Sequence, residues 1–374
     1  MRSGSVLLVM AIATQSGAQA TAIRTIPLSA PDATLTSEFT SLTSVRELAD
    51  GRVLVVDFGE SKLLVADWTR GNAVQVGRNG GGPAEYRTPG TLLPLGGDST
   101  LVPDVQNGRW LLLHGGSIAS FTSADAPAIR SGARRPLGAD FNGTVIFTQS
   151  IAGGSSAEPR RDSVILVRIA RSTGMGDTIA KLKARPATIR VSGPASQPTS
   201  VSIATNPLAG GETAALFSDR WIAIARLDPY SVDWIAPDGK RVRASPLPFE
   251  RVRIDQREKA AFVERQAARS GRAARDPDSF PPWPEIIPPF LAEALLTAPD
   301  GRLWIRRAPT ADNPFPPYDV IDRSGALVAR VEAGNDVQVI GFGRTSVFTV
   351  ATDDNGIQTL QRRPFPRFQK LTGP

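Results

Sequence analysis

Three aspartates occupy the same kind of position in this sequence, each directly after a run of strand-forming residues. Asp57 ends Val-Val-Asp, Asp104 ends Val-Pro-Asp and Asp228 ends Arg-Leu-Asp. Carboxylate oxygens that converge from several strands are the ligands that Ca²⁺ prefers. The same carboxylates could instead cap their own turns by accepting hydrogen bonds from backbone N–H groups. Because they recur with a sequence repeat, we favour the capping role and keep the ion site as the alternative.

A second group of polar residues mixes both signs of charge. One part lies in the glycine-rich loop 77–87, and the other ends the strand expected at 302–307. If these segments share one face of the fold with the aspartates, they form a rim suited to a polar or anionic molecule, or to a protein loop. The candidate ligand-binding residues are Asp57, Arg78, Glu85, Tyr86, Arg87, Asp104, Arg306 and Arg307.

The single histidine of the chain, His114, restricts the chemistry that this protein can perform. Metal sites built from several histidines are excluded, and a Ser-His-Asp triad would depend on this one residue. No Gly-x-Ser-x-Gly elbow accompanies it, and it directly precedes a Gly-Gly pair typical of a hairpin turn. We therefore assign no catalytic residue or metal ligand and expect no cofactor, with Ca²⁺ as the one ion left open.

The elements that would position these residues are repeated β-hairpins. Asp50-Gly51 and Asp300-Gly301 each separate two apolar strands, which is a strong hairpin signal. Looser copies of this unit turn at Gly97-Asp98, Asn142-Gly143, Ser218-Asp219 and Gly343-Arg344. The closer copies are roughly 45 residues apart, which is the length of one four-stranded propeller blade. Six turns predict an all-β fold, a six-bladed β-propeller.

Two further segments complete this prediction. The strand expected at 22–28 would complete the last blade and close the ring, so that no sheet edge stays exposed. Residues 248–291 form an insertion before the inner strand of blade five. Asp255 and Glu258 predict a helix start in its first half, and a proline-rich strap follows.

Composition indicates the compartment and narrows the partners. Residues 1–20 combine a basic start, an apolar run and Ala18-Gln19-Ala20, the pattern of a signal peptide, so residues 21–374 form the mature propeller in the periplasm or outside the cell. We expect a monomer without a membrane span. The net charge is +7, yet no run of like charges or nucleic-acid motif occurs, so nucleic acid is not expected as a partner.

Three segments resemble the secreted bacterial six-bladed β-propellers related to the NHL-repeat group. The loop Gly77-Arg-Asn-Gly-Gly-Gly-Pro-Ala-Glu-Tyr86 is similar to a glycine-rich loop between early blades of that family. Pro299-Asp-Gly-Arg-Leu-Trp-Ile305 and the final segment 339–357 are similar to its hairpin and its last blade. Ala84 stands where the family favours Gly, and the second repeat lacks Asp-Gly-Arg. The resemblance implies the fold and carries little chemistry.

From the sequence we therefore expect an exported binding or interaction module whose ligand or partner site lies on the channel face of a propeller. The alternative is a Ca²⁺-dependent, lactonase-like hydrolase that uses carboxylates of the channel. A purely structural component of the cell envelope is the third possibility. A binding role is favoured over an enzyme because no catalytic group could be identified.

Overall fold

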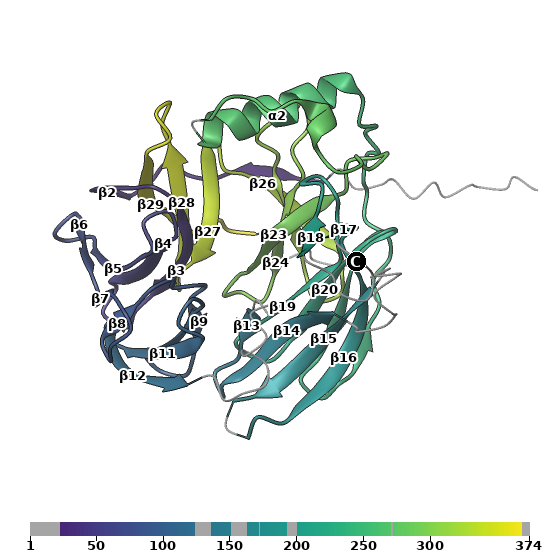
Figure 1. Cartoon of the computed structure of the whole chain (residues 1–374). Coiled ribbons are helices and arrows are strands. Elements are labelled where there is room, and N and C mark those ends of the chain that lie inside the picture. Colours follow the sequence, from purple (N-terminus) through teal and green to yellow (C-terminus); the bar gives the residue numbers. More distant parts are fainter. Residues whose placement is uncertain are drawn as a thin grey trace, which may run out of the picture.

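Each of the six predicted hairpins begins a separate sheet, and the six sheets are arranged in a ring (Figure 1). The computed structural model describes residues 23–123, 136–150, 163–171, 173–192, 200–270 and 272–368. The predicted signal peptide lies outside these residues. Within the described ranges, no helix combines the length and the apolar character that a membrane span requires. The expected six-bladed β-propeller is confirmed.

The first three blades follow one another along the chain, each with its innermost strand first. Blade one consists of β3 (Leu42–Glu47), β4 (Val53–Asp57), β5 (Lys62–Asp67) and β6 (Asn72–Gln75). Blade two consists of β9 (Leu93–Pro94), β10 (Ser99–Asp104), β11 (Arg109–His114) and β12 (Ser117–Ser123). Blade three consists of β13 (Pro136–Ala139), β14 (Thr144–Ser150), β15 (Ser163–Ala170) and β16 (Gly176–Lys183).

The last three blades complete the ring. Blade four consists of β19 (Thr213–Leu216), β20 (Ile222–Leu227), β21 (Tyr230–Ile235) and β22 (Arg241–Val242). Blade five contains β23 (Phe290–Thr297), β24 (Leu303–Arg307), β25 (Tyr318–Ile321) and β26 (Leu327–Glu332). Blade six contains β27 (Val337–Phe342), β28 (Ser346–Thr352) and β29 (Gln358–Pro364). Its innermost strand β27 contacts β3 of blade one, which joins the two ends of the ring.

Ring closure uses a strand that the sequence did not identify. The predicted segment 22–28 contains β1 (Thr25–Pro27), but β1 pairs in parallel with β26 at the outer edge of blade five. The strand that completes blade six is β2 (Ala33–Phe39), which pairs antiparallel with β29. An N-terminal strand therefore does complete blade six, as expected, but that strand is β2 and not the predicted segment 22–28. The chain first covers the edge of blade five and only then reaches blade six.

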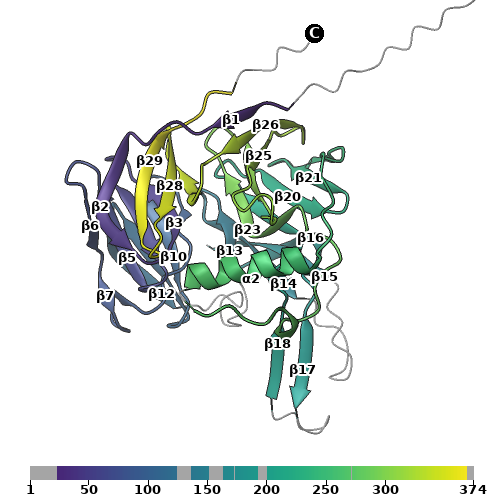
Figure 2. The same cartoon turned by 90° about the horizontal axis from the view of Figure 1, so that it is seen from above.

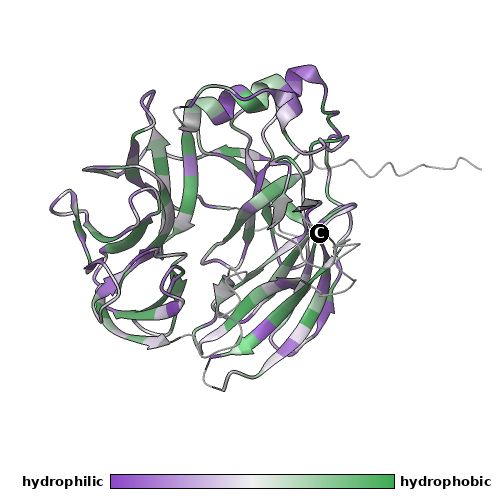
Figure 3. Ribbon diagram, in the orientation of Figure 1, coloured by the Kyte–Doolittle hydropathy of each residue, from purple (hydrophilic) through white to green (hydrophobic). Residues whose placement is uncertain are grey.

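The interior consists of apolar layers between adjacent blades. In β4 all five residues are buried, because a middle strand of a blade packs on both faces. Figure 3 shows this distribution as hydrophobic residues concentrated along the strands. Leu35 of β2 packs with Phe39, Phe348 and Leu360, so the closing strand shares its apolar layer with blade six.

Leu35→Ala is expected to destabilise the protein by about 2–5 kcal/mol, because it leaves a cavity where the ring closes. Urea unfolding followed by circular dichroism measures this effect. Thr34→Ala changes an exposed residue of the same strand and should stay within about 0.5 kcal/mol of the wild type. Equal midpoints for the two variants would contradict closure by β2.

The antiparallel order of the strands places all connections between blades at one end of the propeller, which we call the loop end. The loop with β7 (Arg78–Asn79) and β8 (Glu85–Tyr86) lies there, between blades one and two. The hairpin of β17 (Thr188–Ser192) and β18 (Ser200–Ala204) connects blades three and four, and it extends outward from the ring in Figure 2. The starts of the inner strands and the ends of the second strands also lie at the loop end.

The predicted insertion is present and lies outside the ring of strands (Figure 1). It contains α2 (Gln256–Ser270) and the 3₁₀ helix η1 (Pro277–Ser279), and its last two predicted residues belong to β23. Asp255 accepts a hydrogen bond from the Glu258 N–H at 2.9 Å, as the predicted cap requires. The Glu258 carboxylate does not accept a hydrogen bond from the Asp255 N–H, as it would in a complete capping box, because that N–H donates to the Arg253 carbonyl oxygen. The Glu258 carboxylate accepts from the Ala311 N–H at 2.9 Å and thereby fixes the loop that follows β24.

Candidate functional site

The two predicted aspartates at the ends of β4 and β10 are structural. Asp57 is 2% exposed and accepts hydrogen bonds from the N–H groups of Thr40 and Ser41 at 2.8 and 2.9 Å. Asp104 is 0% exposed and accepts from Arg87 N–H at 3.0 Å, while Arg109 Nε lies 3.1 Å from its carboxylate. Both carboxylates therefore fix the strand connections at the loop end, and their burial leaves no surface for a ligand.

The glycine-rich loop is also held by its own contacts. Tyr86 is fully buried, and its hydroxyl accepts from the Leu63 N–H at 3.0 Å, which corrects its placement on a ligand rim. The Glu85 carboxylate lies 2.7 Å from Arg78 Nε and accepts from the Gly82 N–H at 2.7 Å. These interactions lower the pKa of Glu85, with the Gly82 hydrogen bond as the larger cause.

Arg109, which the sequence analysis did not identify, fixes the backbone of this loop. Its guanidinium donates to the carbonyl oxygens of Gly81, Gly82 and Glu85 at 3.0, 2.9 and 2.7 Å. The Arg87 side chain is exposed. Of the loop residues predicted for a ligand, only Arg78 and Arg87 thus present largely exposed side chains.

The central channel contains a cavity of about 360 Å³ at the loop end, lined by residues of all six blades. Its lining includes hydroxyl and amide side chains from Ser41, Thr43, Ser44, Thr91, Thr213, Gln338 and Gln358. Gln358 Oε1 accepts from the Leu42 N–H at 2.7 Å, and Ser44 Oγ accepts from the Leu92 N–H at 3.0 Å. These bonds orient both side chains, and the amide N–H groups of Gln358 and the hydroxyl of Ser44 can still donate hydrogen bonds to another partner.

Two charged residues enter this cavity because the inner strand of blade five is irregular. Phe290 pairs with Arg307 and Leu295 pairs with Ile305, so residues 291–294 of β23 oppose Arg306 alone. Within this bulge Glu293 has φ +64°, a left-handed conformation that L-residues rarely adopt. Glu293 and Arg306 both line the channel cavity. β-Bulges change the direction of side chains and are common next to functional sites. Residues with strained backbone conformations also cluster at such sites.

Both charges of the bulge already have protein partners. The Arg306 guanidinium lies beside Tyr318, whose pKa is raised by burial, and the arginine opposes that rise. Burial lowers the pKa of Arg185, and the Glu293 carboxylate acts in the opposite direction. The channel therefore contains one carboxylate and one guanidinium among its lining residues, and each interacts with another group of the protein.

The two adjacent arginines of the predicted rim face different cavities. Arg306 lines the channel, whereas Arg307 lines a cavity of about 720 Å³ between the insertion and the loop that follows β24. The sequence prediction that they form one site is therefore not fulfilled. Neither cavity contains the glycine-rich loop, so the structure does not gather the eight candidate residues at one place.

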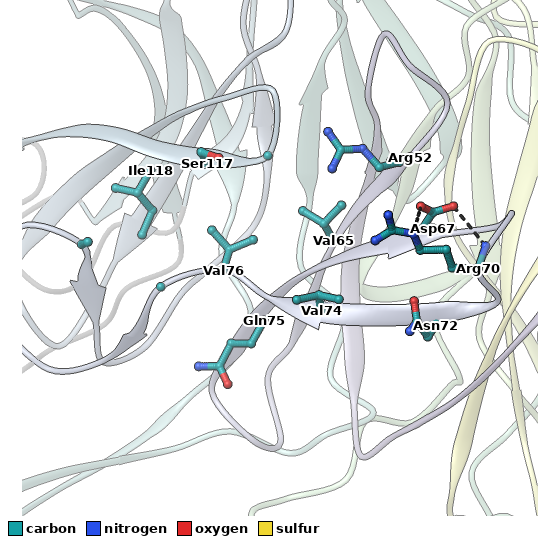
Figure 4. Close-up of a pocket in the computed structure, with 13 residues that line it drawn as sticks. Arg52, Val65, Asp67, Arg70, Asn72, Val74, Gln75, Val76, Ser117 and Ile118 are labelled. Atoms are coloured by element: carbon teal, nitrogen blue, oxygen red, sulfur yellow. Dashed lines mark hydrogen bonds and ion pairs between the residues drawn. The ribbon is translucent and has the colours of Figure 1, made fainter.

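A third hollow of about 430 Å³ lies at the outer side of blades one and two (Figure 4). Val65, Val74 and Ile118 supply apolar surface there. Its charged groups satisfy each other or nearby residues, since Arg70 lies 3.7 Å from Asp67 and Arg52 pairs with Asp50. This groove combines apolar surface and paired charges with the uncharged polar residues Asn72, Gln75 and Ser117.

The described residues include no group of three or more His, Cys, Asp or Glu side chains that could hold a metal ion. Within the described channel lining, Glu293 is the one carboxylate. The sequence does not single out Glu293, because the uninterrupted apolar run before Asp300-Gly301 begins only after this residue. The signal that could have located it is the polar interruption by Glu293 in the apolar run from Phe290 to Leu296.

No family model matches this chain, and no curated protein matches it. Among solved structures, a streptogramin B lyase shares 14% identity, with 89% of this chain and 86% of that chain covered and a TM-score of 0.40. A gluconolactonase from Xanthomonas campestris shares 11%, with 88% of each chain covered and a TM-score of 0.45. Regucalcin from Agrobacterium tumefaciens, a calcium-binding protein, shares 10%, with 92% and 99% covered and a TM-score of 0.36. These distant similarities concern the six-bladed fold and say nothing about a shared activity.

Proposed function

We propose that this protein is a binding module whose ligand is a small, hydrogen-bonding molecule without net charge, held in the channel cavity. The observation that carries the proposal is the bulge in β23, which places Glu293 and Arg306 in the channel at the cost of a left-handed backbone. A strained charged residue in a channel is best explained by a role in recognition. We further propose that the module is exported and acts as a monomer.

The class of ligand follows from the lining. One carboxylate and one guanidinium line the cavity, so the charges of the lining sum to zero and the ligand need not carry a net charge. The hydroxyl and amide groups around them offer both donors and acceptors. A volume of about 360 Å³ suits a molecule as small as a monosaccharide or an amino acid.

The experiment is a calorimetric titration of the mature chain with two sets of probes. Neutral monosaccharides (glucose, galactose and N-acetylglucosamine) form one set, and zwitterionic amino acids (glycine, serine and glutamine) form the other. We expect at least one set to bind. Glu293→Gln should weaken that binding at least about tenfold, because it removes a charge-assisted hydrogen bond worth about 1.5–3 kcal/mol.

Glu332→Gln provides the control, since Glu332 is an exposed glutamate at the end of an outer strand of the same blade. It should bind the probe as the wild type does. Failure of both probe sets, or equal affinity for the wild type and Glu293→Gln, would overturn the proposed function.

A further inference from the structure

The cavity beneath the insertion is formed by two separate parts of the chain. Residues 248–252 and 287–289 of the insertion form one side, and residues 307–317 of blade five form the other. The helix α2 holds these sides together. Glu258 is 5% exposed and accepts from the Ala311 N–H, and Arg265 donates to the Thr310 carbonyl oxygen at 3.1 Å. The cavity is therefore built into the fold, which lowers the entropic cost of binding.

Two arginines share one buried carboxylate at the inner end of this cavity. Asp319 is fully buried, and Arg330 Nε lies 3.2 Å from its Oδ1. An Arg307 nitrogen lies 3.9 Å from its Oδ2, which also accepts a hydrogen bond from the Tyr230 hydroxyl at 3.0 Å. Arg307 and Arg330 line the cavity with side chains that are 16% and 27% exposed. One positive charge of this group is thus left uncompensated.

The other charged residues around the cavity do not cancel this charge at its inner end. Asp312 pairs with Arg257 of α2, and Glu250 is exposed to solvent. Burial raises the pKa of Asp319, while both arginines act in the opposite direction. The inner end therefore favours a single negative charge in addition to that of Asp319.

Prolines and large apolar side chains make up much of the remaining wall, and Thr310 and Asn313 add polar groups to it. Five prolines line the cavity, namely Pro248, Pro288, Pro289, Pro316 and Pro317. Phe249 lies with its ring 5.6 Å from the Arg307 guanidinium, and Ile287 is 2% exposed. A volume of about 720 Å³ exceeds what a small inorganic anion needs. An apolar body attached to the anionic group would fill the rest.

We propose that this cavity is a second binding site, independent of the channel, for an organic monoanion that combines a carboxylate with an aromatic or aliphatic body. The carboxylate lies between Arg307 and Arg330, where guanidinium groups can donate parallel hydrogen bonds. The apolar body packs against the proline rings and Phe249.

Calorimetric titrations at low ionic strength test this site with benzoate, acetate, inorganic phosphate and the neutral benzyl alcohol. Benzoate is expected to bind at least tenfold more tightly than each of the other three. Benzyl alcohol binding as tightly as benzoate would contradict the need for an anion. Phosphate or acetate binding as tightly as benzoate would contradict the need for an apolar body.

Two substitutions in the site should change benzoate affinity in opposite directions. Arg330→Gln should weaken binding about tenfold or more, because it removes a charged donor. Asp319→Asn should strengthen binding several-fold, because the amide can still accept from Tyr230 while one negative charge next to the arginines is removed. A purely structural ion-pair cluster would not produce this gain.

Arg323→Gln is the control, since Arg323 pairs with Asp219 away from this cavity, and it should bind benzoate normally. Circular dichroism verifies the fold of each variant. If Asp319→Asn does not fold, Arg330→Gln still decides the matter, and wild-type affinity in that variant overturns the proposal. Glu293→Gln should leave benzoate affinity unchanged, so failure of the channel site and failure of this site are distinguishable.

Discussion

Asp104→Ala is expected to lower the free energy of unfolding by about 3–5 kcal/mol. The substitution removes the acceptor for the Arg87 and Thr88 N–H groups and leaves Arg109, whose side chain is 8% exposed, without its carboxylate. A buried guanidinium without a counter-charge is far more costly than the loss of a surface pair. Urea unfolding followed by tryptophan fluorescence gives the midpoint and the free energy.

Asp228→Ala is the matched control. Asp228 directly follows the second strand of blade four, and Asp104 is the last residue of the second strand of blade two. The Asp228 side chain is 69% exposed and pairs with the exposed Arg251, so the change should stay within about 0.5 kcal/mol. Neither variant should alter binding in the channel. A loss for Asp104→Ala no larger than that for Asp228→Ala would show that the buried carboxylate does not fix the loop.

Glu293→Gly should increase stability and weaken ligand binding in the channel. Glycine adopts φ +64° without the steric cost that a side chain carries there, which is worth about 1 kcal/mol. The same substitution removes the carboxylate, so probe affinity should fall at least about tenfold. An increase in unfolding midpoint together with a loss of affinity is the signature of a residue that is retained for recognition.

The control for this variant is Asp336→Gly, which relieves a positive φ of 55° at an exposed residue outside the channel lining. It should increase stability in the same direction and leave probe affinity unchanged. A drop in stability for Glu293→Gly would show that the carboxylate supports the fold, and unchanged affinity would remove it from the site.

The six blades could be predicted because each hairpin turn is a local property of the chain. Asp50-Gly51 and Asp300-Gly301 require positive φ at the glycine, and the structure has φ +85° and +83° there. The alternation of apolar residues then defines the flanking strands. The closing strand β2 was missed because its partner β29 lies more than 300 residues further along the chain, and no local pattern records that pairing.

The candidate site was less accessible to prediction because it depends on register between strands. Arg306 and Arg307 were identified as site residues, but consecutive side chains of a strand point to opposite faces, so Arg306 lines the channel and Arg307 lies beside Asp319. The bulge that places Glu293 opposite Arg306 depends on the pairing of β23 with β24, which no local pattern records. Asp57 and Asp104 showed the regularity of the repeat, and that regularity reflects their role in fixing strand connections. The buried aspartates Asp57 and Asp104 thus support the fold, whereas Glu293 of the channel site interrupts the apolar pattern of its strand.

The most direct test of the channel site is a crystal structure of the mature protein with the tightest monosaccharide or amino acid probe bound. We predict that the probe lies in the channel cavity, in hydrogen-bond contact with Glu293 or Arg306. A probe bound in the groove between blades one and two, or elsewhere outside the channel, would contradict it.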